Sequence, residues 1–211
     1  MTPNDTEPNT LTPEPTQQEK QEALEKIQAI EALFNHLKGI LVHSFSDYTV
    51  EGLIGQHPMF GPLFVFSLTR EGKSYGCGFF VNEVARVFQT NSDPEQWLSS
   101  FYVDMIRTGE SKPLPDSPKT EEERNALIDK IIVPYCAESI RSEFPNESMH
   151  VDLSMNEQLG PVIEAGFPSI TEGSNTTGLP LPYIYALYLL NRDPAEPIIE
   201  ALNQIYEKHG K

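Results

Sequence analysis

The sequence has few of the features that would assign it to a specialised class. Its only cysteines in 211 residues are Cys77 and Cys136, too few for a disulfide framework. A single bridge between them stays open, but reduced thiols in a cytoplasmic protein are the simpler interpretation. The longest strongly apolar run, "YIYALYLL" at 183–190, is far shorter than the roughly 20 residues that span a bilayer. The start, "MTPNDTEPNT", lacks the basic and apolar regions of a secretory signal. We therefore expect a cytoplasmic protein that does not enter a membrane.

Positive charge is also scarce. The chain has 15 Lys and Arg against 31 Asp and Glu, a formal net charge of −16, and its basic residues are scattered. Such a chain repels phosphates and anionic membranes, so we expect no direct nucleic-acid binding. The excess of carboxylates favours a basic protein partner, since opposite charge raises association rates. A nucleic-acid mimic, in which carboxylates replace phosphates, is a further hypothesis.

No established catalytic or metal-binding motif is present. The sequence has no G-x-S-x-G, G-x-G-x-x-G, H-E-x-x-H or paired C-x-x-C. The segment "GSNTTGLP" (173–180) has the glycine spacing of a phosphate-binding loop, but Leu179 and Pro180 stand where Lys and Ser or Thr are required. We therefore expect no cofactor and no metal site.

The N-terminal pattern changes at Gln17. Residues 1–16 hold four prolines and little apolar surface, so we expect a disordered leader. From Gln17, apolar residues recur at steps of three and four, which predicts a long amphipathic helix over 17–43. Its apolar stripe packs on the core or, as an alternative, pairs with a second copy in a homodimer. We interpret 17–211 as a single α+β domain.

Three strand-like segments follow the helix, at 48–55, 62–69 and 74–82. Glu71-Gly72 separates the last two and predicts a hairpin, because glycine readily supplies the positive φ of a tight turn. The middle and last segments are apolar on both faces, so we expect helices to cover much of both sides. "MHVDL" (149–153) is a candidate fourth strand.

The rest of the chain is predicted to be mostly helical. Asp93 and Pro94 begin one helix, and Thr120 with Glu123 forms a capping box for another, which Pro134 should break or kink near Ile132. Ser154 and Glu157 suggest a further short helix that ends at Gly166, followed by a long loop over 167–182 and two more helices. We find no internal repeat. The sequence thus predicts an α+β fold: a long N-terminal helix, a small antiparallel sheet of three to four strands and a mostly helical C-terminal half.

Cys77 lies between two glycines in the third strand segment. Strand alternation surrounds it with large apolar groups, so we interpret it as a core residue with a raised pKa. Cys136 would have a lowered thiol pKa if Pro134 started a new helix. His150 and Asp152 share one face of a strand. Cys136, His150 and Asp152 are therefore the candidates for a ligand-binding or enzymatic site between the sheet and the 167–182 loop.

The preferred hypothesis is a non-enzymatic, acidic protein-binding module that acts on a basic protein partner. Proteins of the immunity type and of the secretion-chaperone type have this combination of charge, size and missing catalytic motifs. Phe60, in the loop at 55–62, and Trp97, the single tryptophan, are the candidate partner-binding aromatics. The ligand-binding protein or enzyme is the alternative.

Overall fold

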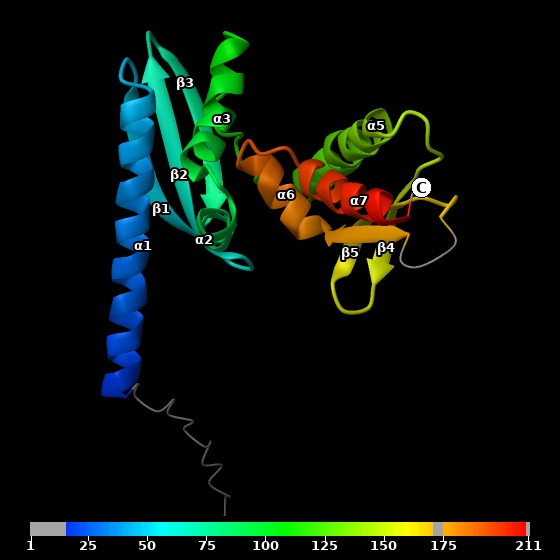
Figure 1. Ribbon diagram of the computed structural model, residues 1–211, viewed down its shortest axis with the longest axis horizontal. Coiled ribbons are helices and arrows are strands. Elements are labelled where there is room, and N and C mark those ends of the chain that lie inside the picture. Colours follow the sequence, from blue (N-terminus) through cyan, green and yellow to red (C-terminus); the bar gives the residue numbers. More distant parts are fainter. Residues whose placement is uncertain (1–15, 171–174, 210–211) are drawn as a thin grey trace, which may run out of the picture.

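The computed structural model describes residues 16–170 and 175–209 (Figure 1). The predicted leader lies outside these residues, except for Thr16. Helices and strands follow in the order α1 (Gln17–Ser44), β1 (Thr49–His57), β2 (Gly61–Arg70), β3 (Lys73–Phe80), α2 (Val81–Thr90), α3 (Pro94–Arg107), α4 (Glu121–Leu127), η1 (Ile128–Ile132), α5 (Val133–Glu143), β4 (His150–Asn156), β5 (Gly160–Gly166), β6 (Thr176–Pro180), α6 (Leu181–Leu189) and α7 (Glu196–His209).

The predicted α+β class is confirmed, with a long N-terminal helix, antiparallel sheets and helices in the C-terminal half. There are two antiparallel three-stranded sheets, ordered β1-β2-β3 and β4-β5-β6. The short helix predicted to begin near Ser154 and end at Gly166 is wrong, because these residues form the end of β4, its hairpin turn and β5. Part of the predicted 167–182 loop is β6, which runs directly into α6.

Helix α1 begins with a capping box, in which Thr16 and Glu19 bond each other's backbone N–H groups. Its C-terminal part packs on the first sheet through Leu37, Ile40 and Leu41. The N-terminal part projects beyond the sheet (Figure 1), and there Leu24 and Ile27 are exposed. Only part of the predicted apolar stripe therefore packs on the core.

The predicted hairpin between the second and third strands is confirmed. Glu71 (φ 53°) and Gly72 (φ 77°) both adopt the left-handed backbone conformation of a tight two-residue turn. The helix predicted from Asp93 is also confirmed, since the Asp93 carboxylate accepts a hydrogen bond from the Gln96 N–H at 2.9 Å and Pro94 occupies the first turn.

Pro134 does not end its helix. The five residues before Val133 form a π-helical turn, η1, in which the Val133 N–H bonds the Ile128 carbonyl. Proline has no N–H for the carbonyl of residue 130, so a regular α-helix would leave that carbonyl without its partner. The wider turn absorbs this defect, and α4, η1 and α5 follow one another without a break.

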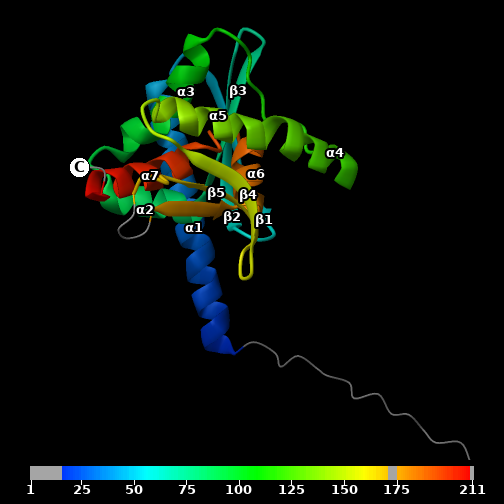
Figure 2. The same ribbon diagram turned by 90° about the vertical axis from the view of Figure 1, so that its right-hand side faces the viewer.

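The order of elements repeats. The first repeat, residues 16–107, and the second, residues 120–209, each consist of a helical segment, three antiparallel strands and two helices (Figures 1 and 2). The helical segments both begin with a capping box, at Thr16 and Thr120, and both end at a phenylalanine cap, Phe45 and Phe144. These two phenylalanines lie 99 positions apart and have similar backbone angles, φ −126°, ψ 56° and φ −117°, ψ 61°.

The first hairpin of each repeat carries the clearest correspondence. The turn of this hairpin follows His57 in one repeat and Asn156 in the other. The next strand begins four residues later at a glycine of positive φ, Gly61 or Gly160. His57 Nδ1 and Asn156 Oδ1 each accept hydrogen bonds from the backbone N–H groups two and three residues ahead. The expectation of no internal repeat is thus wrong, although the sequence correspondence is confined to short segments.

Each repeat has its own core, and a smaller third cluster joins them. In this cluster Leu63 and Phe80 of the first sheet pack against α6 of the second repeat. The outer edge of β3 is also bonded to other parts of the chain: the Gly76 N–H to the Lys112 carbonyl at 2.9 Å and the Gly78 N–H to the Leu190 carbonyl at 3.0 Å. The glycines beside Cys77 therefore mark a close approach, and Leu190 occupies the space where residue 78 has no side chain.

Candidate functional site: a cleft between the two repeats

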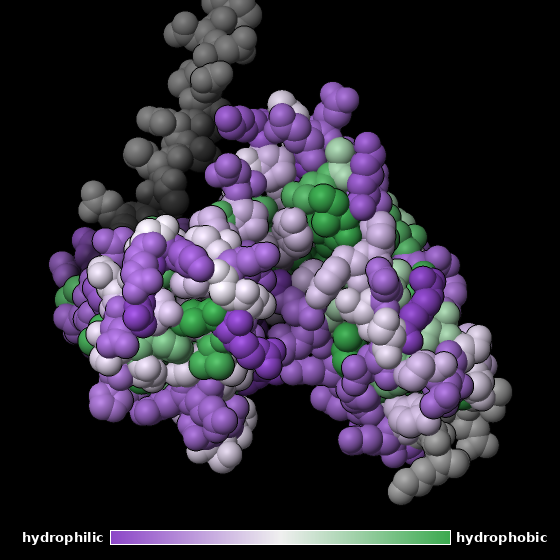
Figure 3. Space-filling model, turned by 90° about the horizontal axis from the view of Figure 1, so that it is seen from above, coloured by the Kyte–Doolittle hydropathy of each residue, from purple (hydrophilic) through white to green (hydrophobic). Residues whose placement is uncertain are grey.

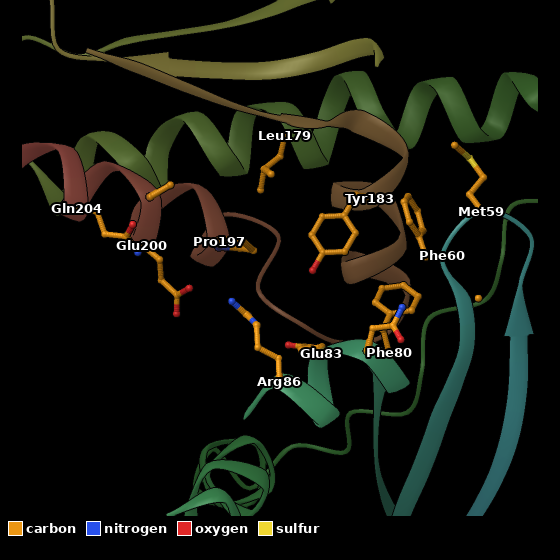
Figure 4. A pocket seen from close by; sticks show the side chains of 13 residues that line it. Met59, Phe60, Phe80, Glu83, Arg86, Leu179, Tyr183, Pro197, Glu200 and Gln204 are labelled. Carbon is orange, nitrogen blue, oxygen red and sulfur yellow. The ribbon is translucent and has the colours of Figure 1, made fainter. Parts of the chain in front are cut away.

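A cleft of about 840 Å³ lies between the repeats (Figure 4). In each repeat the third strand runs straight into a helix, and these strand–helix junctions place Phe80 and Glu83 on one side and Leu179 and Tyr183 on another. Seen from above, the surface is hollowed between the two repeats (Figure 3). The cleft is lined by Met59, Phe60, Gly61, Phe80, Asn82, Glu83, Arg86, Leu179, Tyr183, Pro197, Glu200, Ala201 and Gln204.

One wall of the cleft is aromatic. The ring of Phe60 lies 5.6 Å from that of Phe80 and 5.3 Å from that of Tyr183, while Phe80 and Tyr183 stack at 5.8 Å. His57 stacks on Phe60 at 4.8 Å from the β1–β2 turn. Burial, followed by the charge of Glu83, raises the pKa of the Tyr183 hydroxyl. Tyr183 is therefore neutral at physiological pH and can donate a hydrogen bond into the cleft.

The opposite side of the cleft is polar. Arg86 on α2 and Glu200 on α7 point into it from different elements (Figure 4). No ion pair involves either Arg86 or Glu200 within residues 16–170 and 175–209. Gln204 adds an amide one turn beyond Glu200. The cleft thus combines an aromatic wall with one cation and one anion that are both free to bind a ligand.

Glu83 has a second function beside the cleft. It accepts two hydrogen bonds from Arg192, from Nη1 at 3.0 Å and Nη2 at 2.7 Å. The Arg192 guanidinium lies over the rings of Phe101, Phe79 and Trp97 at 4.3, 5.1 and 5.8 Å. Burial opposes its charge most strongly, but the hydrogen bonds and the charge of Glu83, with smaller contributions from Cys77 and Glu196, together raise the pKa of Arg192 above its ordinary value. This pair fixes the second repeat against the first.

The structure separates the predicted ligand-binding residues. Cys136 is fully buried in the core of the second repeat, where burial raises the pKa of its thiol to about 12. Because α5 continues directly from η1, Cys136 has no free helix N-terminus beside it, and the condition for a lowered thiol pKa is not met. His150 and Asp152 lie 3.4 Å apart on β4, and half or more of each side chain is exposed.

The outer face of the second sheet, next to the predicted 167–182 loop, has a smaller hollow of about 210 Å³. Its lining includes Glu164 and Gly178 but none of the three predicted ligand-binding residues. The two cysteines are free and both buried, so the bridge that the sequence left open is not formed. Burial also raises the pKa of Cys77 to about 12, in agreement with its interpretation as a core residue.

The two predicted partner-binding aromatics have different surroundings. Phe60 lines the cleft. Trp97 packs against Phe79 and Phe101 at 5.5 and 5.3 Å, next to Arg192. No pattern in the sequence pointed to Glu83, Arg86, Tyr183 or Glu200. The residues joined by the Glu83–Arg192 pair lie 109 positions apart, so no local pattern could reveal it.

No protein family model matches the chain, and no curated protein matches it as a relative. Among the described residues, no group of three or more His, Cys, Asp or Glu could hold a metal ion. In the same part of the chain, no helix combines the length and the apolar character needed to cross a membrane.

Proposed function

We propose that this protein is a non-enzymatic, acidic binding module that holds a segment of a basic protein partner in the cleft between its repeats. The observation that carries the proposal is the composition of the cleft. The aromatic wall of Phe60, Phe80 and Tyr183 offers an apolar site for an anchoring side chain, and Glu200 offers a carboxylate beside it. Buried aromatic anchors dominate the affinity of most protein interfaces.

The charge of the whole chain supports a basic partner. A net charge of −16 attracts a cationic protein from a distance, and Glu200 would then bind one of its Lys or Arg side chains. Arg86, across the cleft, would bind an acidic group or a backbone carbonyl of the same segment. The two buried, unbridged thiols agree with a cytoplasmic location, which we include in the proposal.

The disposition of the thiols favours binding over catalysis. Both thiols have a pKa near 12 and neither lines the cleft, so neither can supply a thiolate there at neutral pH. The exposed His150–Asp152 pair does not line the cleft either. The proposal therefore assigns the cleft residues to recognition.

The proposal is tested by photo-crosslinking in lysate of the source organism. A photoreactive phenylalanine analogue replaces Gln204, in the cleft, and in a control replaces Val103, which is 51% exposed on α3. We expect one basic protein to be crosslinked from position 204 and no protein from position 103. The yield of the crosslinked protein should fall as the salt concentration rises. Equal labelling from both positions, or no labelling from position 204, would contradict the proposal.

A pair of charge reversals on α7 tests the cleft with the identified partner. Glu200→Lys reverses a charge in the cleft, and Glu207→Lys makes the same change in net charge at an exposed position outside it. We expect Glu200→Lys to weaken binding about tenfold, or about 1.4 kcal/mol. Glu207→Lys should have a much smaller effect. Equal losses would mean that only the overall charge matters and that the cleft is not the binding site.

A further inference from the structure

The open edges of the two sheets differ in how they are protected. The outer edge of β3 is bonded to Lys112 and Leu190, and Asn191 donates a side-chain hydrogen bond to the Gly76 carbonyl at 2.8 Å. At the edge of β1, Lys38 lines a hollow with Glu51 and Leu53. A lysine beside an edge strand opposes pairing with another strand.

The outer edge of β4 lacks both kinds of protection. Within residues 16–170 and 175–209, no backbone hydrogen bond joins β4 to any strand or loop other than β5. The strand contains no lysine and no proline. The position that corresponds to Lys38 in the second repeat, 99 residues later, is Ala137.

Apolar side chains are exposed along this edge. Val151, Leu153 and Met155 stand on the face of the sheet whose β5 partners are Ala165, Ile163 and Pro161. Val151 is buried in the core, but Leu153 is 46% exposed and Met155 is 77% exposed. An exposed strand edge with such side chains is a template for pairing with another strand.

We propose that β4 pairs in antiparallel orientation with β4 of a second copy of this chain, about a twofold axis at Leu153. In this register Leu153 faces Leu153 of the other copy and Val151 faces Met155, which continues the apolar stripe across the interface. Two three-stranded sheets then become one six-stranded sheet.

The sequence of β4 is self-complementary in this register. On the other face of the sheet, Asp152 is opposite Ser154 and His150 is opposite Asn156, so the one carboxylate of the strand never faces itself. Like charges directly opposite each other would destabilise the pair. The arrangement favours a second copy over an unrelated strand, and it uses a surface separate from the cleft.

Disulfide crosslinking tests the register. Leu153→Cys should form a covalent dimer quickly under mild oxidation, because cross-strand partners have Cβ atoms about 5 Å apart. Met155→Cys is the control: the residue is more exposed, but in this register it lies four strand positions from its own counterpart, about 13 Å away. Cys77 and Cys136 are buried and should not interfere. Equal or faster crosslinking at position 155 would overturn the proposal.

Sedimentation velocity over a range of protein concentrations tests the dimer itself. We expect Leu153→Lys to give a monomer, and Ile54→Lys, the corresponding exposed position on β1, to leave the dimer intact. Rising salt should strengthen the dimer by screening repulsion between two chains of charge −16, whereas it should weaken binding of a basic partner in the cleft. A wild-type protein that is monomeric at every concentration would refute the proposal. A dimer lost in Ile54→Lys or Ile27→Lys but kept in Leu153→Lys would move the interface to β1 or α1 and refute it too.

Discussion

Glu83 and Arg192 form a bidentate ion pair between the two repeats, with N–O distances of 2.7 and 3.0 Å. Arg192 is only 7% exposed, and its Nε is buried with no hydrogen-bond partner among the described residues. The pair replaces the hydration of a buried and a mostly buried charge, so its strength depends on both partners being present.

Arg192→Met should lower the free energy of unfolding by about 3 kcal/mol, because it leaves the mostly buried Glu83 carboxylate unpaired. Adding Glu83→Leu should restore part of the loss, which a double-mutant cycle in urea would measure. Arg70→Met, which removes an exposed pairing with Asp47 and Glu71, is the control and should cost less than about 1 kcal/mol. Equal costs for both arginines would show that the buried pair does not hold the repeats together.

Gly78→Ala should separate or strain the two repeats. A Cβ atom at residue 78 would lie 3.1 Å from Cγ and 3.2 Å from Cβ of Leu190, too close for a leucine whose backbone is bonded to the same strand. We expect a loss of about 1–3 kcal/mol in urea unfolding. Leu190→Ala in the same chain should relieve part of it. Gly39→Ala, in a helix where no atom lies near the new methyl group, should stabilise instead, by up to about 1 kcal/mol.

Stability should fall at alkaline pH because of the two thiols. Burial raises the pKa of Cys77 and Cys136 to about 12, so both stay neutral in the folded protein while the unfolded chain ionises near pH 9. The stabilisation is complete below pH 9 and is lost as pH rises, by about 1.4 kcal/mol per pH unit for each thiol. Urea unfolding of the wild type and of Cys77→Ala between pH 8 and 11 measures this. If the slopes are equal, Cys77 does not contribute.

Binding in the cleft should weaken in acid through His57. Its Nδ1 accepts the N–H groups of Met59 and Phe60, at 3.2 and 3.3 Å, and protonation removes this acceptor. Burial lowers the pKa of His57 in the folded protein, whereas the unfolded chain keeps the ordinary value of about 6.5. Neutral His57 therefore stabilises the folded turn above about pH 6.5, and this stabilisation is lost as pH falls below that value.

The second repeat suggests the matched variant, since Asn156 makes the same two bonds without a titrating group. His57→Asn should therefore bind the partner as the wild type does at pH 7.5 and retain that affinity at pH 5.5. Measuring affinity at both pH values decides the matter. An unchanged pH dependence in His57→Asn would exclude His57 as its source.

Local signals predicted the elements that depend on local chemistry. The capping residues Asp93 and Thr120 and the turn at Glu71-Gly72 act through neighbours in the chain, and each marks a boundary in the structure. The pattern of Ser154 and Glu157 failed because the same residue types also suit a strand end and a turn. There, pairing of β4 with β5 and packing on Ile163 decided the outcome.

The cleft could not be predicted in the same way. Glu83, Tyr183 and Glu200 come from three helices, and only the docking of α6 onto the first sheet brings them together. Phe60, chosen from the sequence as an aromatic residue in the loop at 55–62, lines the cleft, but its role in binding stays a prediction. The Gly-Pro pairs at 61–62 and 160–161 could have revealed the repeat, since each follows a hairpin turn of the same length.

The contact between the repeats joins unlike surfaces of two like units: α6 of one covers the sheet of the other. A contact of this kind propagates into an open filament if each unit keeps both surfaces. Here the second sheet has Glu164 where the first has Val65, 99 positions earlier. Counted from the first residue of each helix, α2 has Arg86 where α6 has Ala186. These charged side chains oppose a third unit of the same kind, and Arg86 instead lines the open cleft.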